Sequence, residues 1–154
     1  MSAQAAVQPD LSAWVGFLRA HAALTRELSS RLEASHTISL RDYDVLVQLY
    51  HAPGRRMRRV DIARTVILSP SGITRLLDGL EDAGWVCKEH CASDARVTYA
   101  KLTDEGLSKF EAARVTHLAD IEELFGSRFT DEERTRLSEL LGRLPLADAG
   151  ACNE

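Results

Sequence analysis

The sequence predicts a mainly α-helical protein that carries one small β-hairpin, and three observations lead to this fold class. Apolar residues recur at helical spacing near both ends of the chain, two short helix-like segments meet at a tight turn in its middle, and two strand-like segments follow them. The 154 residues contain no internal repeat and no linker rich in Gly or Ser. We therefore expect a single domain over residues 1–154.

The first two helices are expected before residue 53. Between residues 11 and 32 apolar side chains recur every three or four positions, and their stripe is too wide for a helix that contacts a single neighbour. Ser39 is placed to cap a second helix, which has Asp42 in its first turn. That helix should end at the break formed by Pro53 and Gly54.

The next two helices are short and follow each other closely. Val60, Ala63 and Ile67 have the spacing of one face of a short helix. After it, Ser69 is a suitable N-cap, and Pro70 occupies the first helical position, where its missing N–H costs nothing. Two short helices joined by a tight turn are typical of a helix-turn-helix.

The second helix of this pair has one apolar and one polar face, and it should end at Ala83 and Gly84. The apolar face has i, i+3, i+4, i+7 spacing and comprises Ile73, Leu76, Leu77 and Leu80. The opposite face comprises Ser71, Thr74, Arg75 and Asp78. Burial of the apolar face would leave a small polar surface exposed near the helix N-terminus.

A β-hairpin and two further helices complete the expected order. Residues 85–89 and 97–102 have strand-like composition, and the segment between them contains turn formers. Thr103 is placed to cap a long helix, and Thr130 with Glu133 has the sequence of a capping box for a last one. The first helix and these last two have more apolar surface than one small core can absorb, so we expect them to form a dimer interface.

The formal net charge of −4 is unevenly distributed along the chain. Nine basic and six acidic residues lie between Arg55 and Lys101, a net +3, which leaves −7 for the rest. This distribution favours a basic face that meets nucleic acid.

The remaining composition excludes several other classes. No apolar run reaches the ~18 residues that span a membrane, and the first ten residues lack the features of a signal peptide. The three cysteines are an odd number, which argues against a disulfide framework. We therefore expect a cytoplasmic protein.

Four short segments stand in a characteristic order, namely SPSGITR at 69–75, LEDAGWV at 80–86, DAR at 94–96 and LTDEG at 102–106. Together they resemble the MarR family of bacterial winged-helix transcription regulators, and the flanking helices extend the similarity to nearly the whole chain. One position departs from the family pattern, because Cys87 stands where a basic residue is expected and Lys88 follows it.

The resemblance implies a winged helix-turn-helix DNA-binding lobe at residues 39–102 and a helical dimerisation region at residues 9–34 and 103–146. It further implies a homodimer that binds a pseudo-palindromic operator in double-stranded DNA and acts as a repressor of transcription. We expect no cofactor.

The first expected DNA contacts lie on the second helix of the helix-turn-helix, which we call the recognition helix. Small residues at its start allow the backbone to approach the duplex, and Ser69, Ser71 and Gly72 meet this need. Thr74 and Arg75 are then the side chains that reach base edges or phosphates. The alternative for Arg75 is a surface ion pair with Asp78, three residues later.

Further contacts are expected on the wing and beside the helix-turn-helix. The resemblance implies that Arg96 enters the minor groove, and Asp94 is better placed to orient this arginine than to meet a phosphate. Arg58 and Arg59 are expected to contact the DNA backbone. Lys88 is a candidate for the phosphate contact at the first wing strand, where the family pattern is displaced.

The resemblance also implies that a small anion, often aromatic or phenolic, acts as an effector and releases the protein from DNA. Its binding crevice would lie between the dimer helices and the DNA lobe, and Trp14, His21, Tyr43 and Tyr50 are candidate lining residues because each combines an apolar body with a polar tip. The alternative is that each of them is an ordinary core residue that packs against its neighbours and binds no ligand.

Three alternatives stand beside a DNA-binding regulator that responds to an effector. Cys87 and Cys91, with His90 between them, suggest a regulator that responds to thiol oxidation or to a metal through the wing. No P-loop, nucleotide-binding glycine motif, nucleophile elbow or zinc-protease motif occurs, so we do not expect an enzyme. A protein-interaction module without DNA would lack a basic recognition face, whereas Arg75 and Arg96 supply one.

Overall fold

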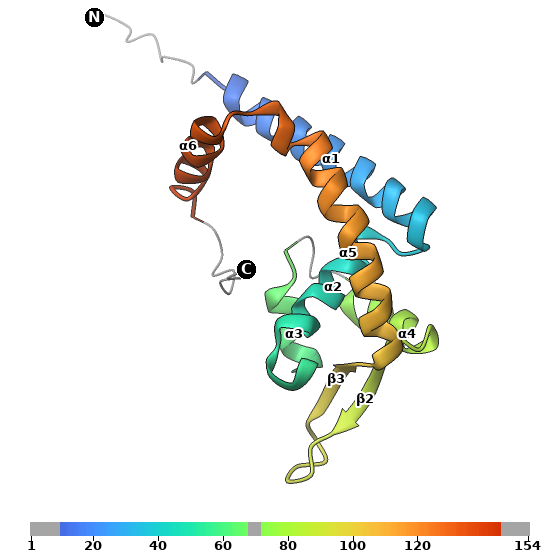
Figure 1. Ribbon diagram of the computed structural model, residues 1–154. Coiled ribbons are helices and arrows are strands. Elements are labelled where there is room, and N and C mark those ends of the chain that lie inside the picture. The colour runs from blue at the N-terminus through green and yellow to red at the C-terminus, as the bar shows by residue number, and fades with distance from the viewer. Residues whose placement is uncertain (1–9, 68–71, 146–154) are drawn as a thin grey trace, which may run out of the picture.

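The computed structural model describes residues 10–67 and 72–145 (Figure 1). Its elements are, in chain order, α1 (Ser12–His36), α2 (Leu40–His51), the 3-10 turn η1 (Pro53–Arg55), β1 (Arg56–Arg58), α3 (Arg59–Thr65), α4 (Ile73–Asp82), β2 (Val86–His90), β3 (Thr98–Leu102), α5 (Asp104–Leu124), the 3-10 turn η2 (Gly126–Arg128) and α6 (Asp131–Leu141). The predicted fold class, mainly α with a small hairpin, is confirmed.

The helix boundaries follow from local capping. Ser39 caps α2 as predicted, because its hydroxyl accepts the backbone N–H of Asp42 at 3.1 Å while the Asp42 carboxylate accepts the N–H of Ser39 at 2.8 Å. Thr130 and Glu133 form the same reciprocal pair at the start of α6. The first helix runs to His36, four residues beyond its predicted end, and stops where Thr37 takes a left-handed conformation.

The core lies where α1, α2, α4, α5 and the sheet meet. Phe110 of α5 is buried at its centre, and its ring lies 5.5 Å from that of Tyr43 and 4.7 Å from that of Tyr50. The predicted apolar face of α4 is confirmed, since Ile73, Leu77 and Leu80 are buried in this core and Leu76 packs against it. The opposite side of α4 therefore faces outward.

The predicted face of α3 is wrong. Val60 and Ile67 are 68% and 71% exposed, whereas Ile62 is fully buried and only Ala63 of the predicted set packs against the core. Two residues along a helix are separated by about 200°, so Ile62 and Val60 point in opposite directions. Ile67 is not on the helix at all, because the chain is already extended at Val66.

The predicted start of the recognition helix is also wrong. Ser69 and Pro70 lie outside the described residues, and α4 itself begins at Ile73. The residue before it, Gly72, has a φ of 75° in the left-handed region, which cannot continue a right-handed helix. The predicted end at Ala83 and Gly84 is confirmed.

The hairpin of β2 and β3 is confirmed, and a third strand joins it. The sheet order is β1-β3-β2, with both pairs antiparallel, so that Ala100 of β3 lies between Met57 and Lys88. Strand β1 was not predicted, because three residues within a basic run are too few to display an alternating pattern. In Figure 1 the β2–β3 hairpin projects from the end of the lobe that holds α3 and α4.

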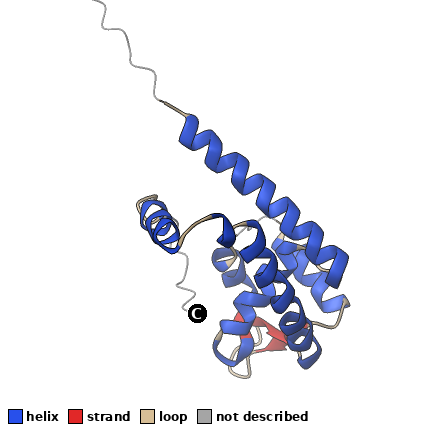
Figure 2. Ribbon diagram, turned by 45° about the horizontal axis from the view of Figure 1, so that its top comes forward, coloured by secondary structure: helices blue, strands red, loops and turns tan. Residues whose placement is uncertain are grey.

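The long helices α1 and α5 lie side by side, and α6 stands apart from the lobe of α2, α3 and α4 (Figure 2). Arg31 of α1 joins the pair through ion pairs with Asp120 and Glu123 of α5 at 2.8 and 3.1 Å. No residue of α6 is buried. Within residues 10–67 and 72–145, no helix combines the length and the apolar character needed to cross a membrane.

Candidate nucleic-acid interface

The outer side of α4 forms the centre of the candidate interface. Thr74, Arg75 and Asp78 are all exposed on it, opposite the buried leucines. Asp78 was the alternative ion-pair partner of Arg75. In the structure its carboxylate pairs instead with Arg59 at 3.0 Å. Within the described part of the chain Arg75 has no ion pair, so its guanidinium is available to a ligand.

The segment that leads into α4 is described from Gly72 onward. Gly72 is exposed, and a Cβ built there would meet only the Arg41 guanidinium at 3.6 Å. Its left-handed backbone lets the chain turn sharply into α4. The predicted contacts Ser69 and Ser71 fall outside the described residues.

The wing presents Arg96 at its exposed turn. The Asp94 carboxylate accepts the backbone N–H of Arg96 at 2.9 Å, and the Asp94 carbonyl accepts the N–H of Val97 at 3.0 Å. Asp94 therefore shapes the turn that carries Arg96. The structure shows this backbone contact and no ion pair between the Asp94 carboxylate and the Arg96 guanidinium, so orientation of the Arg96 side chain by Asp94 stays a prediction.

The other three predicted basic contacts are all held in ion pairs. Arg58 pairs with Asp61 at 2.6 Å, and this hydrogen bond raises the pKa of Arg58. Lys88 pairs with Glu81 at 3.0 Å. Arg59 pairs with both Glu81 and Asp78, and its side chain is only 19% exposed, so the structure points it toward α4 rather than outward.

The sequence reasoning missed a charged cluster at the base of the wing. Glu89 of β2 accepts hydrogen bonds from Arg56 at 2.5 Å and from Lys101 at 3.2 Å, and these contacts lower the pKa of Glu89. The Arg56 guanidinium also lies 4.8 Å from the centre of the Tyr99 ring. No usable signal for this cluster is present in the sequence, because the cluster depends on the unpredicted strand β1, which places Arg56 beside Lys101 of β3.

A cavity of about 260 Å³ lies among α1, α2 and α5. Its lining comprises Thr25, Leu28, Leu40, Tyr43, Asp44, Val47, Ile67 and His117. Of the four predicted effector contacts only Tyr43 lines this cavity. Trp14 and His21 are exposed on α1, and Tyr50 packs against Phe110 in the core.

The polar groups of this cavity are mostly buried. Burial raises the pKa of Tyr43 to about 12 and lowers the pKa of His117, so both groups are uncharged at neutral pH. The Nδ1 atom of His117 is buried without a hydrogen-bond partner among the described residues. Asp44 accepts the backbone N–H of Ile67 at 2.7 Å, which ties α2 to the segment that leads toward α4. His117 and Asp44 were not predicted, because nothing in the local sequence indicates that α5 and α2 meet there.

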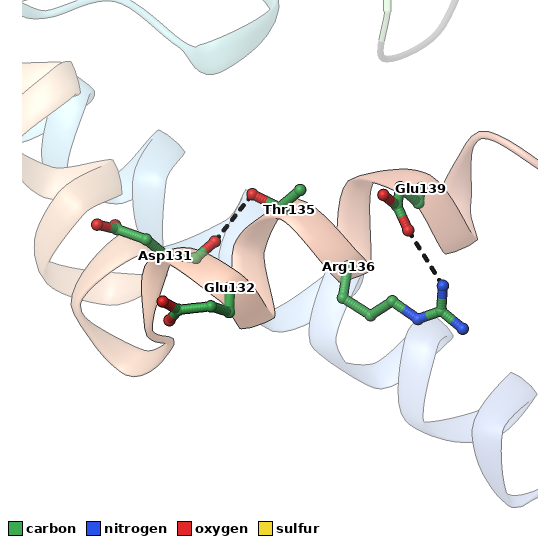
Figure 3. A pocket seen from close by; sticks show the side chains of 5 residues that line it. All are labelled: Asp131, Glu132, Thr135, Arg136 and Glu139. Carbon is green, nitrogen blue, oxygen red and sulfur yellow. Dashed lines mark hydrogen bonds and ion pairs between the residues drawn. The ribbon is translucent and has the colours of Figure 1, made fainter.

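A second hollow of about 450 Å³ lies along the polar face of α6 (Figure 3). Its side chains are Asp131, Glu132, Thr135, Arg136 and Glu139, all from one helix. Arg136 pairs with Glu139 at 3.1 Å, and the Thr135 hydroxyl donates to the Asp131 carbonyl at 2.9 Å. These groups satisfy one another on an open surface, and they do not converge on an enclosed site.

The cysteine pair on the wing does not form a site in this structure. Cys87 is exposed, Cys91 is half-buried, and both are free thiols. Four residues along an extended strand span roughly 13 Å, well beyond the ~7 Å between Cα atoms that a disulfide can bridge. No group of three or more metal-ligating side chains occurs in residues 10–67 and 72–145. Regulation through these cysteines is therefore not favoured.

Comparisons with known proteins agree with this geometry. The family model described as MarR family matches residues 38–98. The HTH-type transcriptional regulator PecS of Dickeya dadantii (strain 3937) is 29% identical over 132 residues, which cover 84% of this chain and 78% of that protein.

Two solved structures from Streptomyces coelicolor have a similar fold. The MarR family transcriptional regulator AbsC has a TM-score of 0.79 and 30% identity, over 87% of this chain and 91% of that one. Sco3205, a MarR family transcriptional regulator crystallised in complex with DNA, has a TM-score of 0.78 and 28% identity, over 84% and 81% of the two chains.

Proposed function

Because the chain belongs to the MarR family of transcriptional regulators, we propose that it binds a pseudo-palindromic operator through α4 and the β2–β3 wing of two protomers and represses transcription. It acts by binding rather than by catalysis, and in the cytoplasm, where the DNA is. The observation that carries this proposal is the outer side of α4, which leaves Thr74 and Arg75 exposed while the leucines behind them are buried.

The distribution of exposed apolar surface supports the assignment of DNA binding and dimerisation to two different parts of the chain. Residues 39–102 form the DNA-binding lobe, and residues 9–34 with 103–146 form the dimerisation region. Large apolar side chains are exposed in the latter region, at Leu11, Trp14, Phe17, Leu18, Val115, Leu118, Leu140 and Leu144. A surface of this kind is stable in water when a second copy covers it.

Two arginine substitutions test the DNA contacts. Arg75→Ala should weaken operator binding by about 5- to 150-fold, since a bidentate arginine contact with guanine is worth ~1–3 kcal/mol of discrimination. Arg96→Ala should weaken binding and also reduce its salt dependence, because a cation near the phosphates is lost from each protomer. Both effects are measured by fluorescence anisotropy on an operator selected from random duplexes by the wild-type protein.

Arg128→Ala is the matched control for both substitutions. Arg128 is exposed in η2, which follows the C-terminal end of α5, whereas the wing precedes its N-terminal end, and removal of Arg128 changes the net charge equally. Because Arg128 belongs to the proposed dimerisation region, the comparison is made at a protomer concentration at which the variant is dimeric, and operator binding should then stay at the wild-type level. If Arg75→Ala and Arg96→Ala bind the operator no more weakly than Arg128→Ala does, the assigned interface is wrong.

The cavity beneath α1 supports release of DNA by a small effector. Its walls are apolar, and the buried Nδ1 of His117 has no hydrogen-bond partner among the described residues, so an uncharged aromatic compound fits the cavity better than a carboxylate. Bound there, a ligand would act through its different affinities for conformations that bind and do not bind DNA. Phenol should weaken operator binding by the wild type but not by Val47→Trp, which fills the cavity. If phenol weakens operator binding equally in both proteins, the cavity is not the effector site.

A further inference from the structure

Four charged side chains form a network behind the recognition helix. Arg59, at the first position of α3, pairs through Nη1 with Glu81 at 2.5 Å and through Nη2 with Asp78 at 3.0 Å, both on α4. Glu81 uses its second carboxylate oxygen to accept Lys88 of β2 at 3.0 Å. We call Arg59, Asp78, Glu81 and Lys88 the α3–α4–wing network.

The centre of the network is shielded from solvent. The side chains of Arg59 and Glu81 are 19% and 16% exposed, whereas those of Asp78 and Lys88 are about half exposed. Ion pairs at this depth are screened less than exposed ones, and a guanidinium with two separate carboxylate partners fixes direction as well as distance. The network is therefore satisfied only at one relative placement of α3, α4 and β2.

The recognition helix depends on such contacts for its orientation. It has ten residues, begins directly after the left-handed Gly72, and has no side-chain cap hydrogen bond at its N-terminus. Asp78 lies three residues after Arg75, and Glu81 lies one turn further along the same helix. A rotation of α4 that broke the network would also move the Arg75 guanidinium across the groove.

We propose that Arg59 and Glu81 are positioning residues for sequence recognition, which set the angle at which α4 presents Thr74 and Arg75 and do not themselves contact DNA. This inference rests on the proposed operator binding. It assigns Arg59 a role different from the phosphate contact expected from the sequence, and it gives Glu81 a part in DNA binding despite its negative charge.

The charge of Glu81 makes the inference testable, because two effects have opposite signs. Removal of a carboxylate beside a DNA-binding face should strengthen binding to any duplex by electrostatics alone. Loss of positioning should instead weaken binding to the operator and leave binding to a scrambled duplex unchanged or slightly stronger. The ratio of operator affinity to scrambled-duplex affinity is therefore the quantity to measure.

Glu81→Gln should lower this ratio about tenfold, within the range expected when a member of a coupled network is lost. Asp82→Asn is the matched control, since Asp82 is the next residue of α4, is exposed, and forms no ion pair or hydrogen bond within the described residues. Its ratio should stay at the wild-type value. If Glu81→Gln keeps the wild-type ratio, or if its affinities for both duplexes fall equally, the proposal is overturned.

Arg59→Lys provides a second, independent variant that retains the positive charge. A phosphate contact would survive this change with the same salt dependence, whereas a single ammonium cannot replace the two-partner guanidinium. The proposal predicts a similar tenfold loss in the ratio, and a loss in the Arg59→Lys/Glu81→Gln double variant that is smaller than the two single losses combined, because both residues share the Arg59–Glu81 pair. An unchanged ratio in Arg59→Lys, or fully additive losses in the double variant, would overturn it.

Failure of this inference can be told apart from failure of the proposed function. If the wild-type protein selects no duplex from the random pool, operator binding itself is wrong. If it selects one and Glu81→Gln binds that duplex as well as the wild type does, only the positioning role is wrong. Unfolding curves of each variant identify any that has lost its fold, and the other variant then decides the matter.

Discussion

Replacement of Gly106 by alanine tests how tightly the wing is anchored to the long helix α5. Gly106 is buried in the first turn of α5, and its N–H donates to the capping hydroxyl of Thr103 at 2.9 Å. A Cβ at this position would lie 2.0 Å from the carbonyl oxygen of Trp85. Ordinary contact begins at 3.4 Å, so the backbone just before β2 would have to move by about 1.4 Å.

The expected cost follows from two opposed contributions. Overpacking against neighbours costs typically ~1–3 kcal/mol, and the upper end applies because the obstacle is backbone held by the Thr103 N–H at 3.1 Å. Alanine recovers about 1 kcal/mol of helix propensity relative to glycine. The net expectation for Gly106→Ala is a loss of about 2 kcal/mol in the free energy of unfolding.

Gly79→Ala is the matched control, because Gly79 lies inside α4 and a Cβ there would meet nothing within 4 Å. This variant should gain up to about 1 kcal/mol. The assay is urea unfolding followed by circular dichroism, with all variants at one protomer concentration since a dimer's stability depends on it. If Gly106→Ala is as stable as the wild type, the close contact between α5 and Trp85 does not exist as described.

Three further outcomes are expected. Ser39→Ala should lose about 1 kcal/mol in urea unfolding by removing the cap of α2, and an unchanged midpoint would deny the capping role. Because burial lowers the pKa of His117 in the native state, the unfolded state binds a proton more readily. The free energy of unfolding should therefore be constant above about pH 6.5 for this group and decrease as the pH falls from there toward the lowered native pKa. His117→Gln should lack that part of the decrease. If the free energy of unfolding changes between pH 7.5 and 5.5 by the same amount in His117→Gln and in the wild type, the assignment to His117 is contradicted. Peroxide should affect operator binding equally in the wild type and in Cys87→Ser/Cys91→Ser, whereas protection in the double variant would restore thiol regulation.

The parts of the fold that could be predicted from sequence are those with strong local signals. The capping residues Ser39, Thr103 and Thr130 fix where three helices begin, because each side chain satisfies a backbone N–H within three residues. The apolar stripe of α4 likewise determines its buried face through spacing alone. The start of α4 was misjudged, because Ser69 and Pro70 give the same local signal whether or not a left-handed glycine follows them.

The parts that could not be predicted depend on distant partners. Strand β1 exists because β3, more than forty residues later, supplies hydrogen bonds to three residues that show no pattern of their own. Arg59 was expected to face DNA because its partner Glu81 is distant in the sequence. Only the folded chain brings the two side chains within 2.5 Å of each other. The same limitation hid His117, which reaches the cavity from α5. Local sequence thus indicated the exposed polar side of α4, and tertiary contacts determine which of the charges on and beside it are available.

Hydroxyl-radical footprinting of the selected operator tests the central claim most directly. Two protomers that each present α4 and a wing should protect two symmetric half-sites whose centres lie about one helical turn, roughly 10 base pairs, apart. Arg96→Ala should weaken the minor-groove protection that flanks them. A single protected segment, or protection without two-fold symmetry, would contradict a homodimer that reads DNA with two recognition helices.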